Sequence, residues 1–124
     1  MSTVQCRFAG VTMLQQFADR VVDKMADFGP VQQRKMFGGS GLFYRNIMFA
    51  IAVNDQLYFK ADAETRRLFE ARGLERFSYQ QQGQTFFLDF YHAPAEVFSD
   101  SAVMTRWVRQ ALASAERAHQ AHAA

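Results

Sequence analysis

The sequence predicts an α+β domain in which helices pack on a five-stranded, mainly antiparallel sheet. Two observations predict this fold class. Apolar residues recur every three or four positions in three segments, as on the buried face of an amphipathic helix, and they alternate in shorter runs between those segments, as in strands. The predicted order is helix, three strands, helix, two strands, helix. Because the two kinds of element neither alternate strictly nor separate fully, an α+β architecture fits better than α/β.

The first helix is predicted to begin at Thr12. Thr12 and Gln15 have the spacing of a capping box, in which each side chain bonds the other residue's backbone N–H. Gly29 and Pro30 end the helix, since glycine accepts the left-handed C-terminal conformation and proline cannot extend a helix. Its apolar stripe consists of Leu14, Phe17, Ala18, Val21, Met25 and Phe28.

The next segment has the period of two that is typical of strands. Strand-like runs cover roughly residues 32–37, 42–45, 47–53 and 56–60. The pairs "RN" at 45–46 and "ND" at 54–55 predict turns, and three antiparallel strands in a meander are the simplest product. Both alternating sets of 47–53 are apolar, so we expect this strand to be covered on both faces or to lie at a subunit contact. The set predicted for one face is Ile47, Phe49, Ile51 and Val53.

A short second helix and a hairpin follow. The helix is predicted over about 63–72, with Asp62 as its N-cap and Gly73 just after its end. Two strands, about 76–81 and 85–92, meet at a glycine turn. In the second strand, alternation predicts one face with Phe86, Leu88 and Phe90 and another with Phe87, Asp89 and Tyr91.

The last helix is predicted over about 101–117, with an apolar stripe that places Trp107 against the sheet. These elements form a single domain over 12–117. The flanking segments 1–11 and 118–124 are predicted to be flexible.

Composition indicates a folded cytoplasmic protein. The chain has 124 residues, 49% of them apolar, which suits one domain with one core. Its one cysteine, Cys6, cannot form an intrachain disulfide, and no secretory leader pattern precedes the first helix. The longest apolar run is far shorter than the ~20 residues that cross a bilayer, so no membrane partner is expected.

Three glycines, Gly38, Gly39 and Gly41, raise the question of a phosphate-binding loop. Such a loop has a fixed glycine spacing, a following lysine and a helix after it, and this segment has none of the three. A serine nucleophile at Ser40 would require glycine at position 42, where the chain has leucine. We interpret the glycines as a tight bend or bulge in the sheet.

No other pattern indicates catalysis or a cofactor. His119 and His122 are two ligands where zinc needs three or four, so no metal site is predicted. Asp89 interrupts an apolar strand, but an alternating strand with a solvated face explains it. A small enzyme built around Asp89, Tyr91 and His92 is the least favoured alternative.

Nucleic-acid binding is an alternative that rests on the charge distribution. The net charge is only +2, but residues 34–76 carry eight basic and five acidic side chains. Aromatic residues of the strands, beside the cations Arg34, Lys35, Arg45 and Lys60, could make a sheet face on which bases stack while the cations hold the phosphates. The aromatic set is Tyr44, Tyr58, Tyr79, Phe87 and Tyr91. The candidate contacts to nucleic acid or a partner are Arg34, Lys35, Arg45, Tyr58 and Lys60.

The run "RKMFGGSGLFYRNIMFAIAVNDQLYFKAD", followed by "FEARG", "FSY" and the late "RWVRQALASA", resembles the N-terminal domain of the TfoX (Sxy) family of bacterial competence regulators. The resemblance spans about 17–115. Its signature, to which we assign a structural role, comprises Met36, Phe37, Gly38, Gly39 and Gly41.

The resemblance implies an α+β fold similar to that of type III secretion chaperones, and a role in gene regulation without catalytic residues. Full-length family members help the catabolite activator protein to switch on DNA-uptake genes. They carry a second, helical C-terminal domain, so the resemblance implies a stand-alone N-terminal domain here. We therefore expect a non-enzymatic regulatory domain that contacts protein partners, such as transcription machinery, and forms a homodimer through a sheet face or edge.

Overall fold

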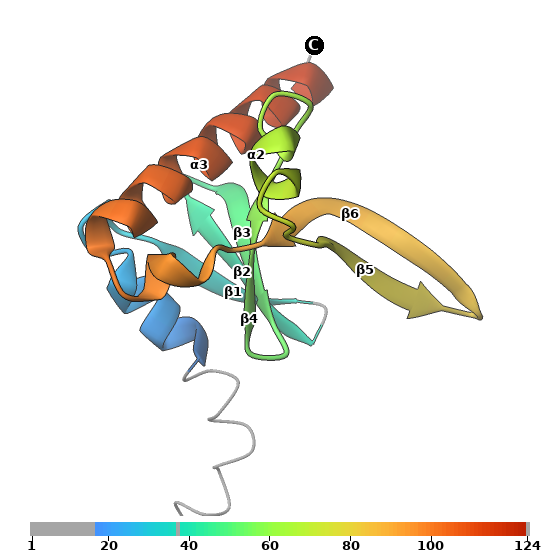
Figure 1. Cartoon of the computed structure of the whole chain (residues 1–124), viewed down its shortest axis with the longest axis horizontal. Coiled ribbons are helices and arrows are strands. Elements are labelled where there is room, and N and C mark those ends of the chain that lie inside the picture. The colour runs from blue at the N-terminus through green and yellow to red at the C-terminus, as the bar shows by residue number, and fades with distance from the viewer. Residues whose placement is uncertain (1–16, 37, 124) are drawn as a thin grey trace, which may run out of the picture.

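The computed structural model describes residues 17–36 and 38–123, and in this part of the chain helices cover one face of an antiparallel sheet (Figure 1). The predicted α+β fold class is confirmed. The predicted capping box at Thr12 and Gln15 and the segment 1–11 lie outside the described residues. Among the described helices, none combines the length and the apolar character needed to cross a membrane.

The sheet has six strands in the order β1-β2-β3-β4-β6-β5, and all neighbours are antiparallel. The strands are β1 (Gln32–Met36), β2 (Gly39–Tyr44), β3 (Ile47–Val53), β4 (Gln56–Lys60), β5 (Arg76–Gln81) and β6 (Gln84–His92). The prediction of five strands is one short, because the glycine segment 39–41 pairs with β1 on one side and β3 on the other. Beyond its junction with β4, the β5–β6 hairpin projects from the rest of the domain, that is, from β1–β4 and the helices, which we call the body (Figure 1).

Two-residue turns connect β2 to β3, β3 to β4 and β5 to β6. The turn pairs 45–46, 54–55 and 82–83 all have positive φ, between 51° and 78°. This is the type I′ geometry, whose twist matches that of the flanking strands. The turns predicted at "RN" and "ND" are therefore confirmed.

A bulge in β3 overturns the predicted division of its side chains. Leu42 pairs with Ala50 and Phe43 with Met48, so Phe49 has no opposite residue on β2. The extra residue shifts the alternation by one position. Ile47, Phe49 and Ala50 consequently pack on the helix side, whereas Met48, Ile51 and Val53 belong to an apolar cluster on the other face.

The helices differ from the prediction mainly at their ends. Residues 17–24 are helical, α2 spans Arg66–Glu70, a 3₁₀ helix η1 spans Ala95–Phe98, and α3 spans Ser101–Ala123. α2 begins later than predicted, and Thr65 is the residue just before it. Asp62 nevertheless makes the predicted capping bonds, to the backbone N–H groups of Glu64 and Thr65 in the preceding turn. α3 continues past residue 117, so residues 118–123 are helical.

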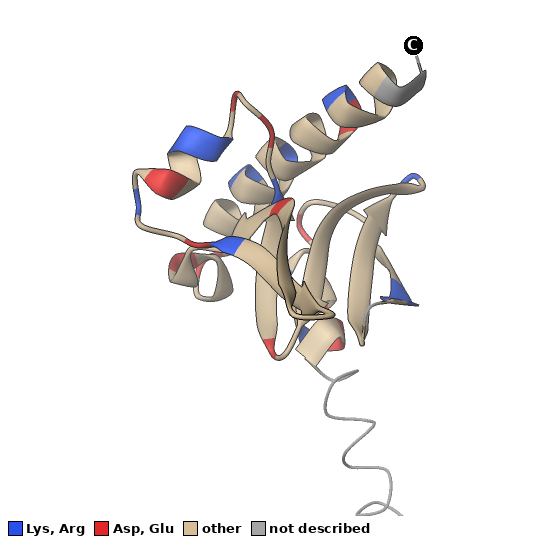
Figure 2. Ribbon diagram, turned by 90° about the vertical axis from the view of Figure 1, so that its right-hand side faces the viewer, with Lys and Arg blue, Asp and Glu red and all other residues tan. Residues whose placement is uncertain are grey.

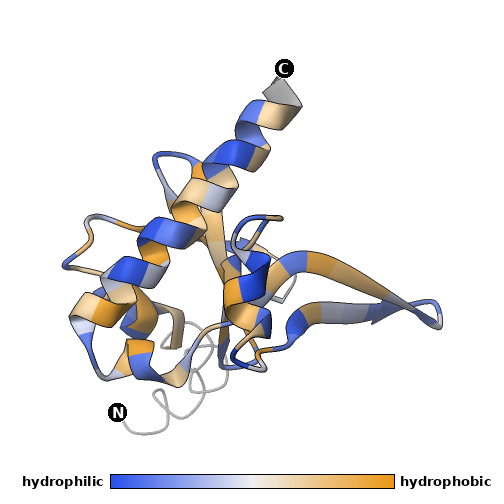
Figure 3. Ribbon diagram, turned by 45° about the horizontal axis from the view of Figure 1, so that its top comes forward, coloured by the Kyte–Doolittle hydropathy of each residue, from blue (hydrophilic) through white to orange (hydrophobic). Residues whose placement is uncertain are grey.

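The main core lies between the helices and the sheet. The apolar stripe of α3 faces inward, while the polar residues of the helix face solvent (Figure 3). Trp107 contacts Phe69 of α2, with ring centroids 5.1 Å apart, and Phe69 stacks at 5.2 Å on Tyr91 of β6. Trp107 thus lies in the core cluster between the helices and the sheet, as predicted. Fully buried core residues include Met25, Leu42, Phe49, Phe59, Phe69, Met104 and Val108.

A polar cluster ties the segment before α2 to α3. Asp62 accepts hydrogen bonds from the backbone N–H groups of Glu64 (3.1 Å) and Thr65 (3.2 Å) and from Arg117 Nε (2.6 Å). The buried hydroxyls of Thr65 and Ser114 lie 2.8 Å apart. α2 is too short to be stable alone, so these bonds help to hold it against α3.

Candidate protein-contact surface

The sheet has an outer face, defined as the face opposite the helices. Every described helix lies on the other side, as the shared core of α3, β3 and β4 shows (Figure 1). Ile51, Val53 and Phe90 are buried on the outer face beneath partly exposed apolar neighbours. These neighbours are Met48, Tyr58, Phe77 and Leu88. The outer face is therefore apolar. A described helix borders it at one end, where Met48, Lys60 and Phe90 share a hollow of about 230 Å³ with residues of α3.

An aromatic row runs along this face from the body into the projecting hairpin. The row consists of His92, Tyr58, Phe77, Tyr79 and Phe86. Successive ring centroids are 4.4, 4.8, 6.4 and 5.5 Å apart. Such separations allow each ring to stabilise the next. The row joins β6, β4 and β5 into one continuous aromatic surface.

The distal end of the row is accessible to solvent. Tyr79 is 40% exposed and Phe86 is 39% exposed, although both are large apolar side chains. Tyr58, nearer the body, is half-buried, and burial together with the charge of Glu75 raises the pKa of its phenol. Tyr58 is consequently a neutral ring at physiological pH. Figure 3 shows apolar residues along much of β6 and hydrophilic ones at the tip of the hairpin.

Three of the five candidate contact residues predicted from the sequence lie on the outer face. Arg34 lies over the Phe43 ring at 4.6 Å and donates a hydrogen bond to Asn46 Oδ1 at 3.2 Å. Lys60 lies over the Phe90 ring at 5.3 Å, and Tyr58 belongs to the aromatic row. Arg34 and Lys60 are on β1 and β4, which are three strand spacings apart, or roughly 14 Å.

The other two candidates lie elsewhere. Lys35 pairs in register with Ser40 and so faces the opposite side of β1 from Arg34. Arg45 is exposed in the β2–β3 turn and lies over the Tyr44 ring, which packs on the helix side. The structure therefore does not bring the five predicted residues into one patch.

Two other cations of segment 34–76 are neutralised by carboxylates. Arg72 pairs with Glu96, and Arg76 pairs with Asp89 at 2.6 Å. In Figure 2, basic and acidic segments are interspersed on the ribbon and do not gather on one face.

The aromatic face that was predicted for base stacking is also wrong in composition. Of its five members, Tyr58 and Tyr79 are on the outer face, whereas Tyr44, Phe87 and Tyr91 are on the helix side.

The glycine signature lies where β1, β2 and β3 meet on the outer face. Gly38 is in the β1–β2 turn with φ of 73°, next to residue 37, which is outside the described part. A Cβ at Gly39 would meet the backbone carbonyl of Ala52 and, at 2.9 Å, Val53 Cγ2. A Cβ at Gly41 would meet the sulfurs of Met36 and Met48. Close strand packing accounts for glycine at both positions.

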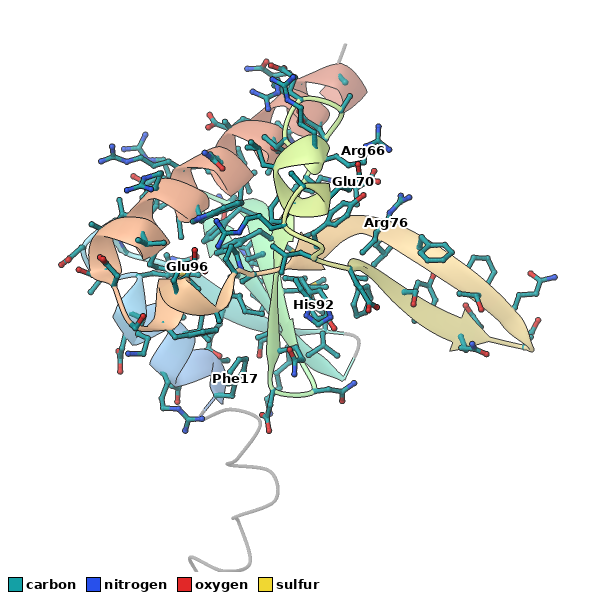
Figure 4. The ribbon with its side chains drawn as sticks, in the orientation of Figure 1. Phe17, Arg66, Glu70, Arg76, His92 and Glu96 are labelled. Carbon is teal, nitrogen blue, oxygen red and sulfur yellow. The ribbon has the colours of Figure 1, made fainter. Side chains whose placement is uncertain are left out.

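Asp89, Tyr91 and His92, the residues of the least favoured alternative, a small enzyme, do not share one face of the sheet. Asp89 and Tyr91 lie on the helix side, where they line a hollow of about 190 Å³ with Asp62 and Arg66. His92 lies on the opposite face against Tyr58, and Figure 4 shows it on the other side of the hairpin base from Arg76. Tyr91 donates a hydrogen bond to Glu70 at 3.1 Å. Within the described ranges, no three His, Cys, Asp or Glu side chains gather as metal ligands would.

Phe77 is the surface residue that the sequence did not single out. Its contact with Tyr58 links the row in the body to the row in the hairpin. The alternation predicted for β6 is correct, since Phe86, Leu88 and Phe90 face outward. The alternation of Phe77 and Tyr79 in β5 was the signal that would have placed them on the same face.

Comparisons with known proteins show the family of this chain. The family model of the TfoX N-terminal domain matches residues 23–115. The DNA transformation protein TfoX1 of Aliivibrio fischeri (strain ATCC 700601 / ES114) is 32% identical over 66 residues, which are 53% of this chain and 32% of that protein. The chain thus aligns with about a third of that relative's length. The chain belongs to the TfoX N-terminal domain family.

Proposed function

We propose that this domain is a non-enzymatic regulatory module of the cytoplasm that acts through protein contacts made by the outer face. The observation that carries the proposal is the aromatic row, whose distal rings are exposed and are not covered by a described helix. Rings arranged in this way supply a large contact area at low entropic cost, and aromatic residues are enriched in protein interfaces.

The process in which the module acts is inferred from its family. The relative from Aliivibrio fischeri is named a DNA transformation protein. We extend this to the present chain as a role in regulating DNA uptake, with transcription machinery as the partner. The pairing of Arg72 and Arg76 with carboxylates and the interspersed charges favour a protein partner over the nucleic-acid alternative, which needs cations gathered along a backbone (Figure 2).

Two adjacent exposed phenylalanines allow a matched test. Phe86 is in the aromatic row on the outer face, whereas Phe87 is on the helix side and is 58% exposed. We expect Phe86→Ala to weaken partner binding about tenfold, while Phe87→Ala changes it less than twofold, because only the first ring lies on the contact surface. Binding is measured by titrating the labelled domain with purified catabolite activator protein on promoter DNA, or with RNA polymerase.

The same variants are compared in the host for transcription of DNA-uptake genes. Equal effects of the two substitutions, or no binding to either protein, would argue against the outer face as the contact surface. Binding to duplex DNA alone, weakening steeply as salt rises, would favour the nucleic-acid alternative instead.

A further inference from the structure

Within residues 17–36 and 38–123, no strand pairs with the outer edge of β5 in the projecting hairpin. β5 is the last strand in the sheet order, and its Ser78, Tyr79, Gln80 and Gln81 are all exposed. A free strand edge presents backbone N–H and C=O groups that pair readily with another strand. The edge therefore needs either protection or a partner.

The turn geometry shows which backbone groups point toward the open edge. Gln81 pairs with Gln84 across a two-residue turn, so these two residues exchange hydrogen bonds. Hydrogen-bonded and non-hydrogen-bonded pairs alternate along an antiparallel ladder. Tyr79 and Phe86 are thus a hydrogen-bonded pair, whereas Ser78 and Gln80 direct their N–H and C=O groups away from β6.

The edge lacks the charges that usually prevent strand pairing. Residues 77–82 include no charged side chain, and at the base of the hairpin Arg76 is paired with Asp89. At the opposite edge of the sheet, β1 carries the exposed cations Arg34 and Lys35. Charged side chains discourage edge-to-edge pairing, so β1 is protected and β5 is not.

We propose that two copies of this chain pair antiparallel through their β5 edges. A two-fold axis at Tyr79 places Ser78 of one copy opposite Gln80 of the other, and the reverse. Both residues direct their backbone groups outward, so each of these pairs can exchange two N–H···O=C hydrogen bonds. The arrangement closes on itself and does not propagate into a fibre.

A second copy fits this edge better than a charged partner strand. The uncharged edge offers no complement to a charged peptide and causes no repulsion between two copies. The same two-fold axis brings the Tyr79 rings of the two copies together on the outer face, because non-hydrogen-bonded pairs have the closest side chains. The aromatic rows of the two copies then join into one surface. This inference stands independently of the proposed partner function.

The first test is the association state of the full chain. We expect light scattering and sedimentation to show a reversible monomer–dimer equilibrium, at the weak end of specific interfaces because the contact is small. Ser78→Pro removes one outward N–H from each chain without touching the β6 ladder, and proline is tolerated at such edge positions. It should weaken the dimer by roughly tenfold or more, whereas Ser78→Ala, which keeps the N–H, should not.

Cysteine crosslinking tests the register. In a Cys6→Ser background, Tyr79→Cys should form a disulfide-linked dimer under mild oxidation, because the Cα atoms of such a pair lie about 4.5 Å apart. Ser78→Cys is the matched control and should not crosslink, since its opposite residue is Gln80 of the other copy.

Hydrogen exchange of the unmodified chain avoids any dependence on variant folding. The amides of Ser78 and Gln80 should become protected as protein concentration rises, and their protection should be lost on dilution. A chain that stays monomeric at about 1 mM would overturn the proposal, as would a dimer that is insensitive to Ser78→Pro. Neither result would affect the comparison of Phe86→Ala with Phe87→Ala, so the two proposals fail separately.

Discussion

Asp62 helps to fix the position of α2, a helix too short to be stable alone. Its hydrogen bonds with Arg117, foremost, and with the backbone at Thr65 and Glu64 lower its pKa from the ordinary 3.8 to about 2, against the opposing effect of burial. A carboxyl whose pKa is lower in the folded state stabilises the fold above its ordinary pKa. That stability is lost as pH falls from about 4 to about 2.

Asp62→Asn should therefore destabilise the domain at neutral pH and matter progressively less in acid. We expect a loss of about 1 kcal/mol at pH 7, less than the pKa shift alone implies because the pair with Arg117 is partly solvated. Urea unfolding at a series of pH values measures the difference in the free energy of unfolding between the variant and the parent. Glu64, which is 69% exposed and also contacts Arg117, supplies the control, and Glu64→Gln should change stability by only a few tenths of a kcal/mol. A difference between Asp62→Asn and the parent that stays constant down to pH 2.5 would contradict this account.

Two glycines of the family signature should respond differently to alanine. At Gly39 a new Cβ meets the backbone carbonyl of Ala52, which cannot move without shifting β3. At Gly41 it meets the flexible ends of Met36 and Met48 and the edge of a ring. We expect Gly39→Ala to cost about 3 kcal/mol and Gly41→Ala about 1 kcal/mol in the free energy of unfolding, because only methionines can repack. Denaturant unfolding of the two variants measures these free energies. Equal losses of stability would contradict the argument, because they would show that the backbone of β3 shifts as readily as a methionine side chain.

At the scale of elements, the hairpin turns were predictable and the bulge was not. Asn46, Asn54 and Asp55 are of the residue types that tolerate positive φ, so these turns are visible in the sequence even though Arg45 is not of such a type. The bulge at Phe49 leaves no such mark, since β3 is apolar at every position and either alternation fits. The structure resolves the ambiguity through the pairs of Leu42 with Ala50 and Phe43 with Met48.

The residues of the outer face were predicted only in part, because the sequence indicates the alternation within a strand but not the order of the strands. Local alternation placed Phe86 on its face correctly, because the side chains of β6 alternate without interruption from Phe86 to Phe90. The separation of Arg34 from Lys60 depends on strand order, which no local pattern of residues encodes.

The structure extends α3 beyond the predicted end at residue 117, because its alanine-rich last turns have high helix propensity although they lack an apolar stripe.

The β3–β4 turn permits a stabilising substitution. Asn54 and Asp55 both have positive φ, of 53° and 59°, and glycine is preferred at the second position of a type I′ turn. Asp55→Gly should raise the free energy of unfolding by about 0.5–1 kcal/mol by removing the left-handed penalty of a residue with a Cβ. Gln56→Gly, one residue later in β4, should lower it by a similar amount, since glycine weakens a strand. Thermal unfolding of both variants checks the opposite signs, and a shift in the same direction for both would refute the turn argument.

At the scale of the whole molecule, stability is unevenly distributed between the body and the hairpin. The body contains the main core, and the hairpin joins it through the pairs of Tyr58 with His92, Phe59 with Tyr91 and Lys60 with Phe90. Farther out, β5 and β6 pair with each other and with no other described strand. A two-stranded hairpin is marginally stable by itself in water, so its distal part depends on the aromatic row.

We therefore expect the distal hairpin to open without unfolding the body. In dilute solution, the amides of Tyr79 and Phe86 should exchange at an opening free energy roughly 2 kcal/mol or more below that of Phe59 in β4. Phe77→Ala should lower their protection further while leaving that of Phe59 almost unchanged, because it removes the ring that links Tyr58 to Tyr79. Trp107 fluorescence and far-UV circular dichroism should still report one unfolding transition, as both follow the body. Equal protection at Tyr79 and Phe59 would instead mean that hairpin and body unfold as one unit, and an aromatic row held that rigidly would present a preformed surface to its partner.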